Sequence, residues 1–216
     1  MKILKTILDI IFPLFCVNCS KRGISLCLDC LSCAHFNEKE VPNFIYPIYD
    51  FRDPIIRKAI WALKYKNKKD IANIFAKEIY SYILEELGDL RALENFQDPV
   101  LIPIPLSKTR EKERGYNQTL LLAKALISLD KNQSFKLEEN ILVKIKETAH
   151  QARLKNKKAR LENLVGTFEV RDIEKIKNHN IILLDDVVTT GATLTEAKKV
   201  LRKAGARKII AFSIAH

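Results

Sequence analysis

The sequence predicts an α/β protein with a mainly parallel β-sheet, preceded by a small cysteine-rich module. Two observations predict this fold class. From residue 49 onward, apolar residues at helical spacing alternate with short apolar runs that indicate strands. The run at 181–184 is apolar at every position, as expected of a strand buried on both faces of a parallel sheet. The order strand, helix, strand then implies right-handed crossovers.

The individual elements follow from spacing and from residues that end helices. Apolar residues at helical spacing predict helices around 55–63 and 71–82, and Gly88 is expected to stop the second. Further helices are predicted at 120–129 and 193–204, the latter ended by Gly205. Strands are predicted at 100–104, 141–145, 181–184 and 208–214. Residues 153–164 indicate a basic helix or a mobile loop, and residues 130–140 match no motif. We expect two units, an N-terminal helix with the cysteine module at 1–45 and an α/β domain at 46–216.

Composition narrows the class of partner. The 216 residues are 47% hydrophobic and 29% charged, which is typical of a soluble globular protein and excludes a disordered one. The formal net charge of +11 favours anionic partners such as nucleotides, nucleic acid or an anionic membrane surface. The alternative is a lysine-rich composition with no bearing on function.

The N-terminal segment begins like a signal peptide but lacks an uninterrupted apolar run and a cleavage site. Asp9 interrupts the apolar run, Pro13 ends it, and no small-residue cleavage site follows. No run reaches the ~18 apolar residues that a membrane span needs. We expect an amphipathic helix at 1–13 and a cytoplasmic protein, with loose association with the membrane surface as the alternative.

All five cysteines lie within one short window. Cys16 and Cys19 form one knuckle, and Cys27 and Cys30 form a second. This spacing can place four thiolates tetrahedrally around one Zn²⁺, which leaves no open coordination position and indicates a structural metal. Cys33 is an alternate ligand, because Cys30 and Cys33 could also form the second knuckle. The segment has few apolar residues, so metal binding would supply its folding free energy.

The strand at 181–184 leads into a segment suited to a phosphorylated sugar. Asp185 and Asp186 follow the strand and can accept hydrogen bonds from ribose hydroxyls beside a divalent cation. Hydroxyl side chains surround Gly191, which lets the backbone approach an anion closely. The amide groups and dipole of the following helix start favour a phosphate. A strand–turn–helix unit needs a glycine and a capping threonine anyway, but that need does not explain two acids followed by three hydroxyls.

A second polar loop follows the strand at 100–104. The residues after Ser107 include Lys108, Arg110, Lys112 and Arg114, which can neutralise a pyrophosphate. Glu111 and Glu113 dilute the charge, so a solvated surface loop is the alternative.

Two further basic segments are candidates for a lid or for contacts with nucleic acid. Between 148 and 160 the chain carries only basic charges, and an exposed helix face is the alternative. The second segment, 64–69, carries Tyr65, which could stack on a base, although isolated tyrosines more often pack on the surface. The candidate nucleic-acid contacts are Lys66, Lys68, Lys69, Arg153, Lys155, Lys157 and Lys158.

The motifs also stand in a specific order along the chain. The cysteine knuckles precede Leu-Lys-Tyr at 63–65, Pro-Ile-Pro-Leu at 103–106 and Arg-Gly-Tyr-Asn-Gln at 114–118. Gln151, Arg160, Asn163 and Gly-Thr-Phe at 166–168 come next, and Leu-Asp-Asp-Val-Val-Thr-Thr-Gly-Ala-Thr at 184–193 comes last. In this order the chain resembles the ComF family of competence proteins over nearly its full length. The last motif alone resembles the phosphoribosyl pyrophosphate (PRPP) signature of type I phosphoribosyltransferases.

The resemblance implies a fold, ligands and site residues. The fold would be a type I phosphoribosyltransferase sheet with an N-terminal zinc module, and the ligand would be PRPP with Mg²⁺. Asp185 and Asp186 would hold the ribose hydroxyls. The 5′-phosphate would be wrapped by Val188, Thr189, Thr190, Gly191, Ala192 and Thr193. The pyrophosphate and lid residues would be Lys64, Tyr65, Ser107, Lys108, Arg110, Arg114 and Arg160.

The resemblance also implies a role in natural transformation, with single-stranded DNA as partner on the cytoplasmic side of the inner membrane, beside other DNA-uptake proteins. The competing hypothesis is a working phosphoribosyltransferase that transfers the sugar to a nitrogen acceptor. No residue stands out as a general base or base-recognition element, so the acceptor stays open. A PRPP-sensing regulator of duplex DNA ranks last, because the sequence has no duplex-reading motif.

Overall fold

The computed structural model describes residues 13–146 and 165–216. Its centre is a five-stranded sheet in which every neighbouring pair is parallel, in the order β1-β7-β6-β2-β3. The strands are β1 (Ile45–Tyr49), β2 (Val100–Pro103), β3 (Lys136–Leu137), β6 (Ile181–Val187) and β7 (Ile209–Ala215). The mainly parallel sheet predicted from the sequence is therefore confirmed.

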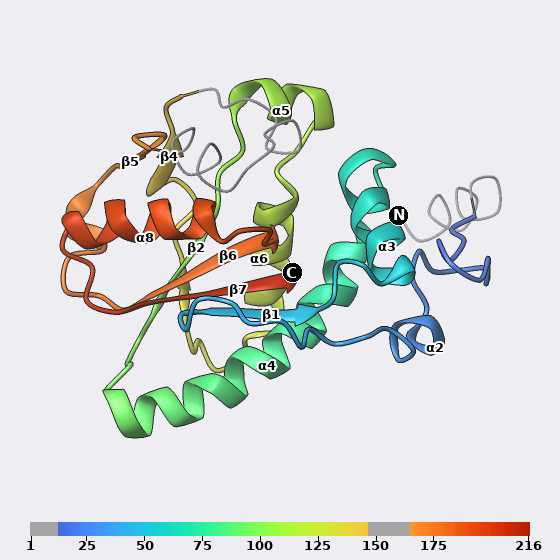
Figure 1. Ribbon diagram of the computed structural model, residues 1–216, viewed down its shortest axis with the longest axis horizontal. Helices are drawn as coiled ribbons and strands as arrows, with labels where there is room; N and C mark the ends of the chain where they lie inside the picture. The colour runs from blue at the N-terminus through green and yellow to red at the C-terminus, as the bar shows by residue number, and fades with distance from the viewer. Residues whose placement is uncertain (1–12, 147–164) are drawn as a thin grey trace.

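Helices cover both faces of this sheet (Figure 1). One buried cluster joins Ile182 and Leu184 of β6 to α4 (Asp70–Glu94) and α6 (Gln118–Leu129), and it extends to α3 (Pro54–Tyr65). A second cluster joins Ile181 and Leu183 to α8 (Ala192–Lys203). Successive strand side chains point to opposite faces, so a strand that is apolar throughout is covered on both sides.

Smaller elements surround this core. The basic residues after Ser107 form the short helix α5 (Lys108–Arg114). β4 (Leu142–Lys144) and β5 (Phe168–Val170) pair antiparallel as a separate two-stranded sheet. The N-terminal segment contains the one-turn helix α2 (Leu28–Leu31), and η2 (Ile173–Lys175) precedes β6.

The cysteine module packs on the α/β domain through apolar and polar contacts. Leu26 and Leu31 are buried in the same cluster as α3 and α4. Ser25 Oγ donates a hydrogen bond of 2.9 Å to Asp70 at the start of α4. The predicted boundary at 45/46 falls on the first residue of β1, an edge strand to which the sequence analysis assigned no element.

Three sequence predictions differ from the structure. Gly88 does not stop α4, which continues to Glu94 and ends at Asn95 in the left-handed region (φ 50°). Leu87 and Leu90 are buried on the helical face around Gly88, and their burial outweighs the ~1 kcal/mol cost of an interior glycine. The basic segment 108–114 is a helix rather than a loop, because Ser107 accepts a hydrogen bond from the Arg110 N–H and caps it.

The third difference concerns β6, which runs on to Val187. The two aspartates are thus part of the strand instead of following it. The predicted N-terminal helix and the basic segment 153–164 lie outside the described residues. Within the described residues, no helix is long and apolar enough to cross a membrane.

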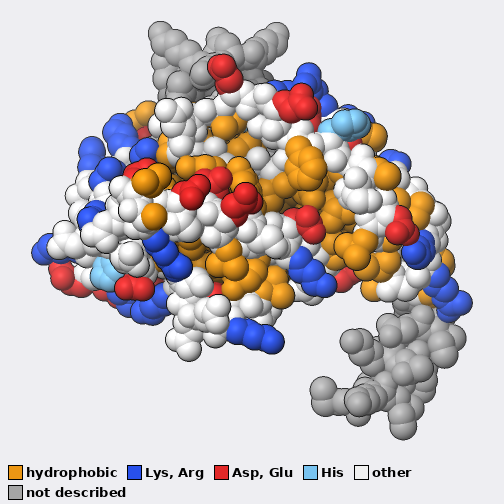
Figure 2. Space-filling view, turned by 90° about the horizontal axis from the view of Figure 1, so that it is seen from below, with side chains coloured by type: hydrophobic (Ala, Val, Ile, Leu, Met, Phe, Trp, Pro, Cys, Tyr) orange, Lys and Arg blue, Asp and Glu red, His pale blue; other side chains and the backbone are white. Residues whose placement is uncertain are grey.

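One face of the molecule carries its charge in a dispersed pattern. On the face shown in Figure 2, acidic side chains lie among hydrophobic ones near the middle, while several lysines and arginines lie toward the edges. The net charge of +11 is therefore not gathered into one patch on this face.

Candidate functional site

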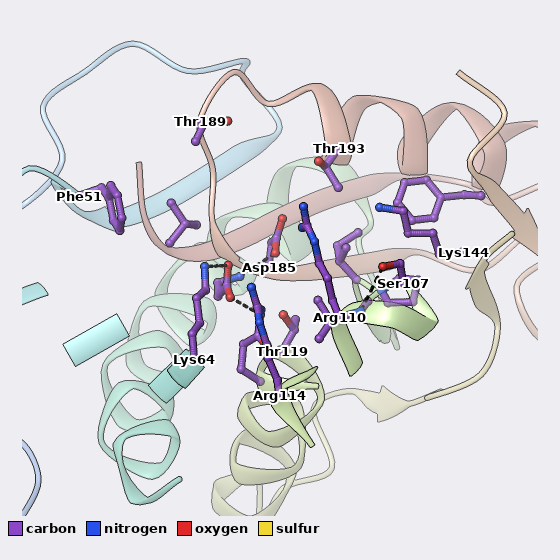
Figure 3. Close-up of a pocket in the computed structure, with 17 residues that line it drawn as sticks. Phe51, Lys64, Ser107, Arg110, Arg114, Thr119, Lys144, Asp185, Thr189 and Thr193 are labelled. Atoms are coloured by element: carbon purple, nitrogen blue, oxygen red, sulfur yellow. Dashed lines mark hydrogen bonds and ion pairs between the residues drawn. The ribbon is translucent and has the colours of Figure 1, made fainter. Parts of the chain in front are cut away.

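A cavity of about 230 Å³ lies where β2 and β6 end and their connections lead into α5 and α8. Ligands of open parallel sheets bind at this edge, beyond the carboxyl ends of the strands. Figure 3 shows Asp185 near the centre of the cavity, with Thr193 on one side and Lys64, Arg110 and Arg114 on the other. The lining residues are Phe51, Lys64, Ile104, Pro105, Leu106, Ser107, Arg110, Arg114, Gln118, Thr119, Lys144, Phe168, Asp185, Asp186, Val187, Thr189 and Thr193.

The two aspartates occupy different environments because they are neighbours on one strand and point to opposite faces. Asp186 points to the α3 and α6 side, where Lys64 Nζ lies 2.9 Å from its Oδ1 and Gln118 Nε2 donates to its Oδ2 at 2.6 Å. Asp186 is buried, with 5% of its surface exposed. Both oxygens of this carboxylate therefore have protein partners.

Asp185 points to the α8 side. The backbone N–H of Asp186 donates to Asp185 Oδ1 at 2.8 Å. Burial, and then the nearby charge of Asp186, raise the pKa of Asp185 to about 7, although Lys64 and Lys144 pull it down. A cation bound beside this carboxyl group would lower its pKa and favour the ionised form.

The turn after β6 forms a small hollow of about 20 Å³ against the first turn of α8. Gly191 has φ 73° and caps the helix, and Thr190 Oγ1 accepts a bond from the Ala192 N–H at 3.4 Å. Val188, Thr189, Gly191, Ala192 and Thr193 all line this hollow. Backbone amides at a helix start, with the helix dipole behind them, favour an anion.

Among the described residues, four cationic side chains line the main cavity. They are Lys64 from α3, Arg110 and Arg114 from α5, and Lys144 from β4. They outnumber the two aspartates, so the cavity favours a ligand with several negative charges. Ser107 is buried and caps α5, which fixes the direction in which its arginines extend.

The structure brings most predicted site residues together. Asp185, Asp186, Thr189, Thr193, Lys64, Ser107, Arg110 and Arg114 line the cavity. Lys108 lies in a neighbouring surface depression, and Tyr65 contacts Arg114 on the outer side, with Nη2 to Oη at 3.3 Å. Arg160 and the candidate nucleic-acid contacts Arg153, Lys155, Lys157 and Lys158 lie outside the described residues.

Nine residues that line the cavity were not among the predicted site residues, namely Phe51, Ile104, Pro105, Leu106, Gln118, Thr119, Lys144, Phe168 and Val187. Gln118 stands in the motif at 114–118, but nothing in the motif reveals that it bonds Asp186 across 68 positions. Among the described residues, Gln118 Oε1 is a buried acceptor without a hydrogen-bond partner. Lys144 is brought to the cavity by the antiparallel β4–β5 pair, which the sequence did not predict.

The predicted cysteine ligands come together in the N-terminal module. The sulfur atoms of Cys16, Cys19, Cys27 and Cys30 lie within 4.8 Å of one another. Four thiolates at this separation can hold a metal ion such as zinc. Asn18 Nδ2 donates to Cys30 Sγ at 3.4 Å, the type of outer contact that orients a ligand sulfur. Cys33 is exposed and lies outside the group, so the second knuckle is Cys27 and Cys30.

Comparisons with known proteins agree with this architecture. The family model for the phosphoribosyl transferase domain matches residues 122–215. Competence protein ComFC of Bacillus subtilis is 30% identical over 170 residues, covering 77% of this chain and 62% of that protein. Competence protein F of Haemophilus influenzae is 31% identical over 158 residues, covering 72% and 66%. The chain thus spans slightly less than two thirds of the length of these two relatives.

Competence protein ComFC of Streptococcus pneumoniae is 29% identical over 206 residues, which are 92% of this chain and 79% of that protein. This match leaves out only a small part of the chain. With its four-cysteine cluster and its phosphoribosyltransferase-type domain, the chain belongs to the ComF family of competence proteins.

Proposed function

We propose that the chain handles incoming single-stranded DNA in the cytoplasm during natural transformation, and that its cavity binds PRPP with Mg²⁺. The observation that supports PRPP as the ligand is the composition of the cavity. It combines Asp185, a glycine turn at the start of α8 and four cationic side chains at one sheet edge. The relatives named as competence proteins support the role in transformation.

Each part of the ligand has a matching part of the cavity. The hollow at 188–193 would take the 5′-phosphate, since amides and hydroxyls can donate to it. Asp185 would face the ribose hydroxyls and the Mg²⁺ ion. Arg110 and Arg114 would hold the pyrophosphate, because guanidinium groups bind such oxygens through paired donors.

Asp186 has a different part in this proposal. Its two oxygens are taken by Lys64 and Gln118, so it serves mainly to hold these side chains at the cavity wall. Zinc at the cysteine cluster would be structural and would take no part in ligand chemistry.

Calorimetry with the full-length, zinc-loaded protein tests the ligand. Wild type is expected to bind Mg²⁺–PRPP, and the Asp185→Ala, Asp186→Ala double variant is expected to lose binding. Asp89→Ala removes an exposed carboxylate from α4 and serves as the matched control. Absence of heat with wild type would refute the ligand assignment. If the double variant folds, binds DNA and still supports transformation, the ligand has no part in that role.

Single-stranded DNA binding has its own signature. Phosphate contacts release counterions, so affinity should fall steeply as salt rises, with a slope of about −0.7 per contact on logarithmic axes. The measurement is fluorescence anisotropy of a labelled oligomer at several salt concentrations. If the affinity does not change with salt concentration, or if no binding occurs at low salt, the proposed role in handling single-stranded DNA is wrong.

Active phosphoribosyl transfer is the second candidate. The observation in its favour is the position of Arg110 and Arg114 at the cavity, where they could stabilise a departing pyrophosphate. The acceptor would be a nitrogen nucleophile that displaces pyrophosphate from the anomeric carbon. Pyrophosphate release across a panel of nucleobases, amines and DNA distinguishes the two candidates. Binding of PRPP without turnover would leave a binding module.

A further inference from the structure

Helix α3 exposes two large aromatic side chains that the core does not use. Trp61 is 51% exposed and Tyr65 is 55% exposed, whereas Ile60 and Leu63 on the same helix are buried. The two residues are four positions apart and therefore lie one above the other on the outer face of the helix. Their ring centroids are 5.8 Å apart with an angle of 50° between the planes. Together they form a paired aromatic surface, the Trp61–Tyr65 platform.

Each ring of the platform is accompanied by a cation. Lys66 Nζ lies 4.9 Å from the centroid of the Trp61 ring. Arg114 Cζ lies 5.1 Å from the centroid of the Tyr65 ring. Both cations sit at the ends of long, flexible side chains, so they can turn toward an anion while another planar group takes their place over the ring.

The segment of the chain that carries the platform has charge of one sign. From residue 54 to residue 69 the chain has six basic residues and no acidic one. Lys69 Nζ, further along, lies 4.6 Å from the centroid of the Tyr116 ring. Unlike an apolar docking face, this surface places positive charge beside both exposed rings of the platform, which favours a partner that is both planar and anionic.

The platform is continuous with the cavity. Arg114, which stacks on Tyr65, also lines the cavity, and Lys64, adjacent in sequence to Tyr65, lines it as well. A chain of nucleotides that crosses α3 would therefore pass directly by the mouth of the cavity.

We propose that Trp61 and Tyr65 are a base-stacking platform for single-stranded nucleic acid, with Lys66 and Arg114 contacting the flanking phosphates. This inference deepens the proposed function, because it rests on a role in handling single strands and names the surface that performs it. Stacking needs bases whose faces are accessible. A duplex, whose bases are already stacked on each other, would bind only through its phosphates.

Intrinsic fluorescence tests the platform directly, because Trp61 is the only tryptophan in the chain. A thymidine oligomer titrated into the full-length, zinc-loaded protein at low salt should quench this emission. An abasic sugar–phosphate oligomer of equal length carries the same charge without bases. It should bind at least about tenfold more weakly and quench little, since each stacked base contributes about 1–3 kcal/mol.

Variants separate stacking from charge, with anisotropy of a labelled oligomer as the readout. Trp61→Ala and Tyr65→Ala should each weaken binding by about tenfold. Trp61→Phe and Tyr65→Phe keep a ring and should stay close to wild type. Leu93→Ala removes an exposed apolar side chain (82% exposed) from the end of α4 and is the matched control. Thermal unfolding of each variant confirms that it folds.

The outcomes are distinguishable from failure of the proposed function. If DNA binds but neither quenches Trp61 nor distinguishes the alanine variants from wild type, the platform is wrong while DNA handling stands. If wild type binds no oligomer at low salt, both the base-stacking platform and the proposed handling of DNA are refuted. Trp61→Ala should bind Mg²⁺–PRPP as wild type does, so a loss there would show damage to the cavity and overturn the assignment.

Discussion

Lys64 Nζ lies 2.9 Å from Asp186 Oδ1, and this ion pair joins the C-terminal turn of α3 to the end of β6. Both side chains are mostly buried, with 17% and 8% of their side-chain surfaces exposed. The pair therefore fixes one wall of the cavity to the sheet. It also couples the helix that carries the Trp61–Tyr65 platform to the strand that carries Asp185.

Removing one partner of the Lys64–Asp186 pair should lower the free energy of unfolding more than removing both partners. Lys64→Met leaves Asp186 as a buried carboxylate held only by Gln118, and we expect the free energy of unfolding to fall by roughly 3 kcal/mol. Lys64→Met with Asp186→Leu removes both charges and should recover much of that loss. Urea unfolding of wild type, the single variant and the double variant measures the difference. A single variant as stable as wild type would contradict the structural part given to this pair.

Stability should depend on pH through Asp185. Its pKa in the folded chain is about 7, well above the ordinary aspartate value, because burial and Asp186 disfavour its charged form. The folded state thus holds a proton that the unfolded state releases near pH 4. Stability is greatest below the unfolded value and falls as pH rises toward 7.

Melting temperature between pH 5 and pH 8 checks this dependence in the ligand-free protein. Asp185→Asn cannot ionise, so its profile should be flatter than that of wild type. Mg²⁺ at the higher pH should raise the melting temperature of wild type more than that of the variant. Parallel profiles for the two proteins would show that another group controls the dependence.

The contrast between these two aspartates shows what the sequence could and could not predict. The apolar run at 181–184 predicted the strand but ended it before the two aspartates. Because β6 continues to Val187, period-two alternation places Asp185 and Asp186 on opposite faces. Their partners depend on the packing of α3 and α6, which brings Lys64 and Gln118 to the same carboxylate. No local pattern encodes such long-range contacts.

The cysteine cluster, in contrast, could be predicted from the sequence. Cysteine spacing is a local property, and the ligands chosen from it are the four that converge in space. What spacing could not decide was the exclusion of Cys33, because that depends on the turn after Leu31, which leaves the side chain exposed. Strand β1 was missed because Pro47 interrupts its pattern, a residue that edge strands tolerate.

Zinc removal should weaken the α/β domain as well as the module. His35 Nδ1 lies 2.8 Å from Asp53 Oδ2, and Asp53 Oδ1 caps α3 by accepting from the Ile55 N–H at 2.8 Å. The module is thus tied to the start of the helix that supplies Lys64. A chelator should release about one zinc per chain and lower the melting temperature.

Zinc content of cysteine variants gives the control for that experiment. Cys30→Ser should lose the metal, because it removes one of four converging ligands. Cys33→Ser should keep it, since Cys33 is exposed and outside the group. Retention of zinc by the first variant, or its loss from the second, would show that the ligand set is different.

Gly191→Ala should harm ligand binding more than folding. Gly191 has φ 73°, a conformation in which a residue with a side chain strains the turn before α8, and an added Cβ would lie 3.1 Å from Ile45 Cδ1, which would have to move slightly. A left-handed residue with a side chain costs on the order of 1 kcal/mol, while displaced amides would no longer match the phosphate.

Gly88→Ala is the matched control. It lies inside α4 with no heavy atom within 4 Å of the added Cβ, and should stabilise the helix by about 0.5–1 kcal/mol. Calorimetry with Mg²⁺–PRPP should therefore show at least about tenfold weaker binding for Gly191→Ala and unchanged binding for Gly88→Ala, if each lost phosphate contact is worth about 1.5 kcal/mol. Equal affinity in the two variants would mean that the turn does not hold the phosphate.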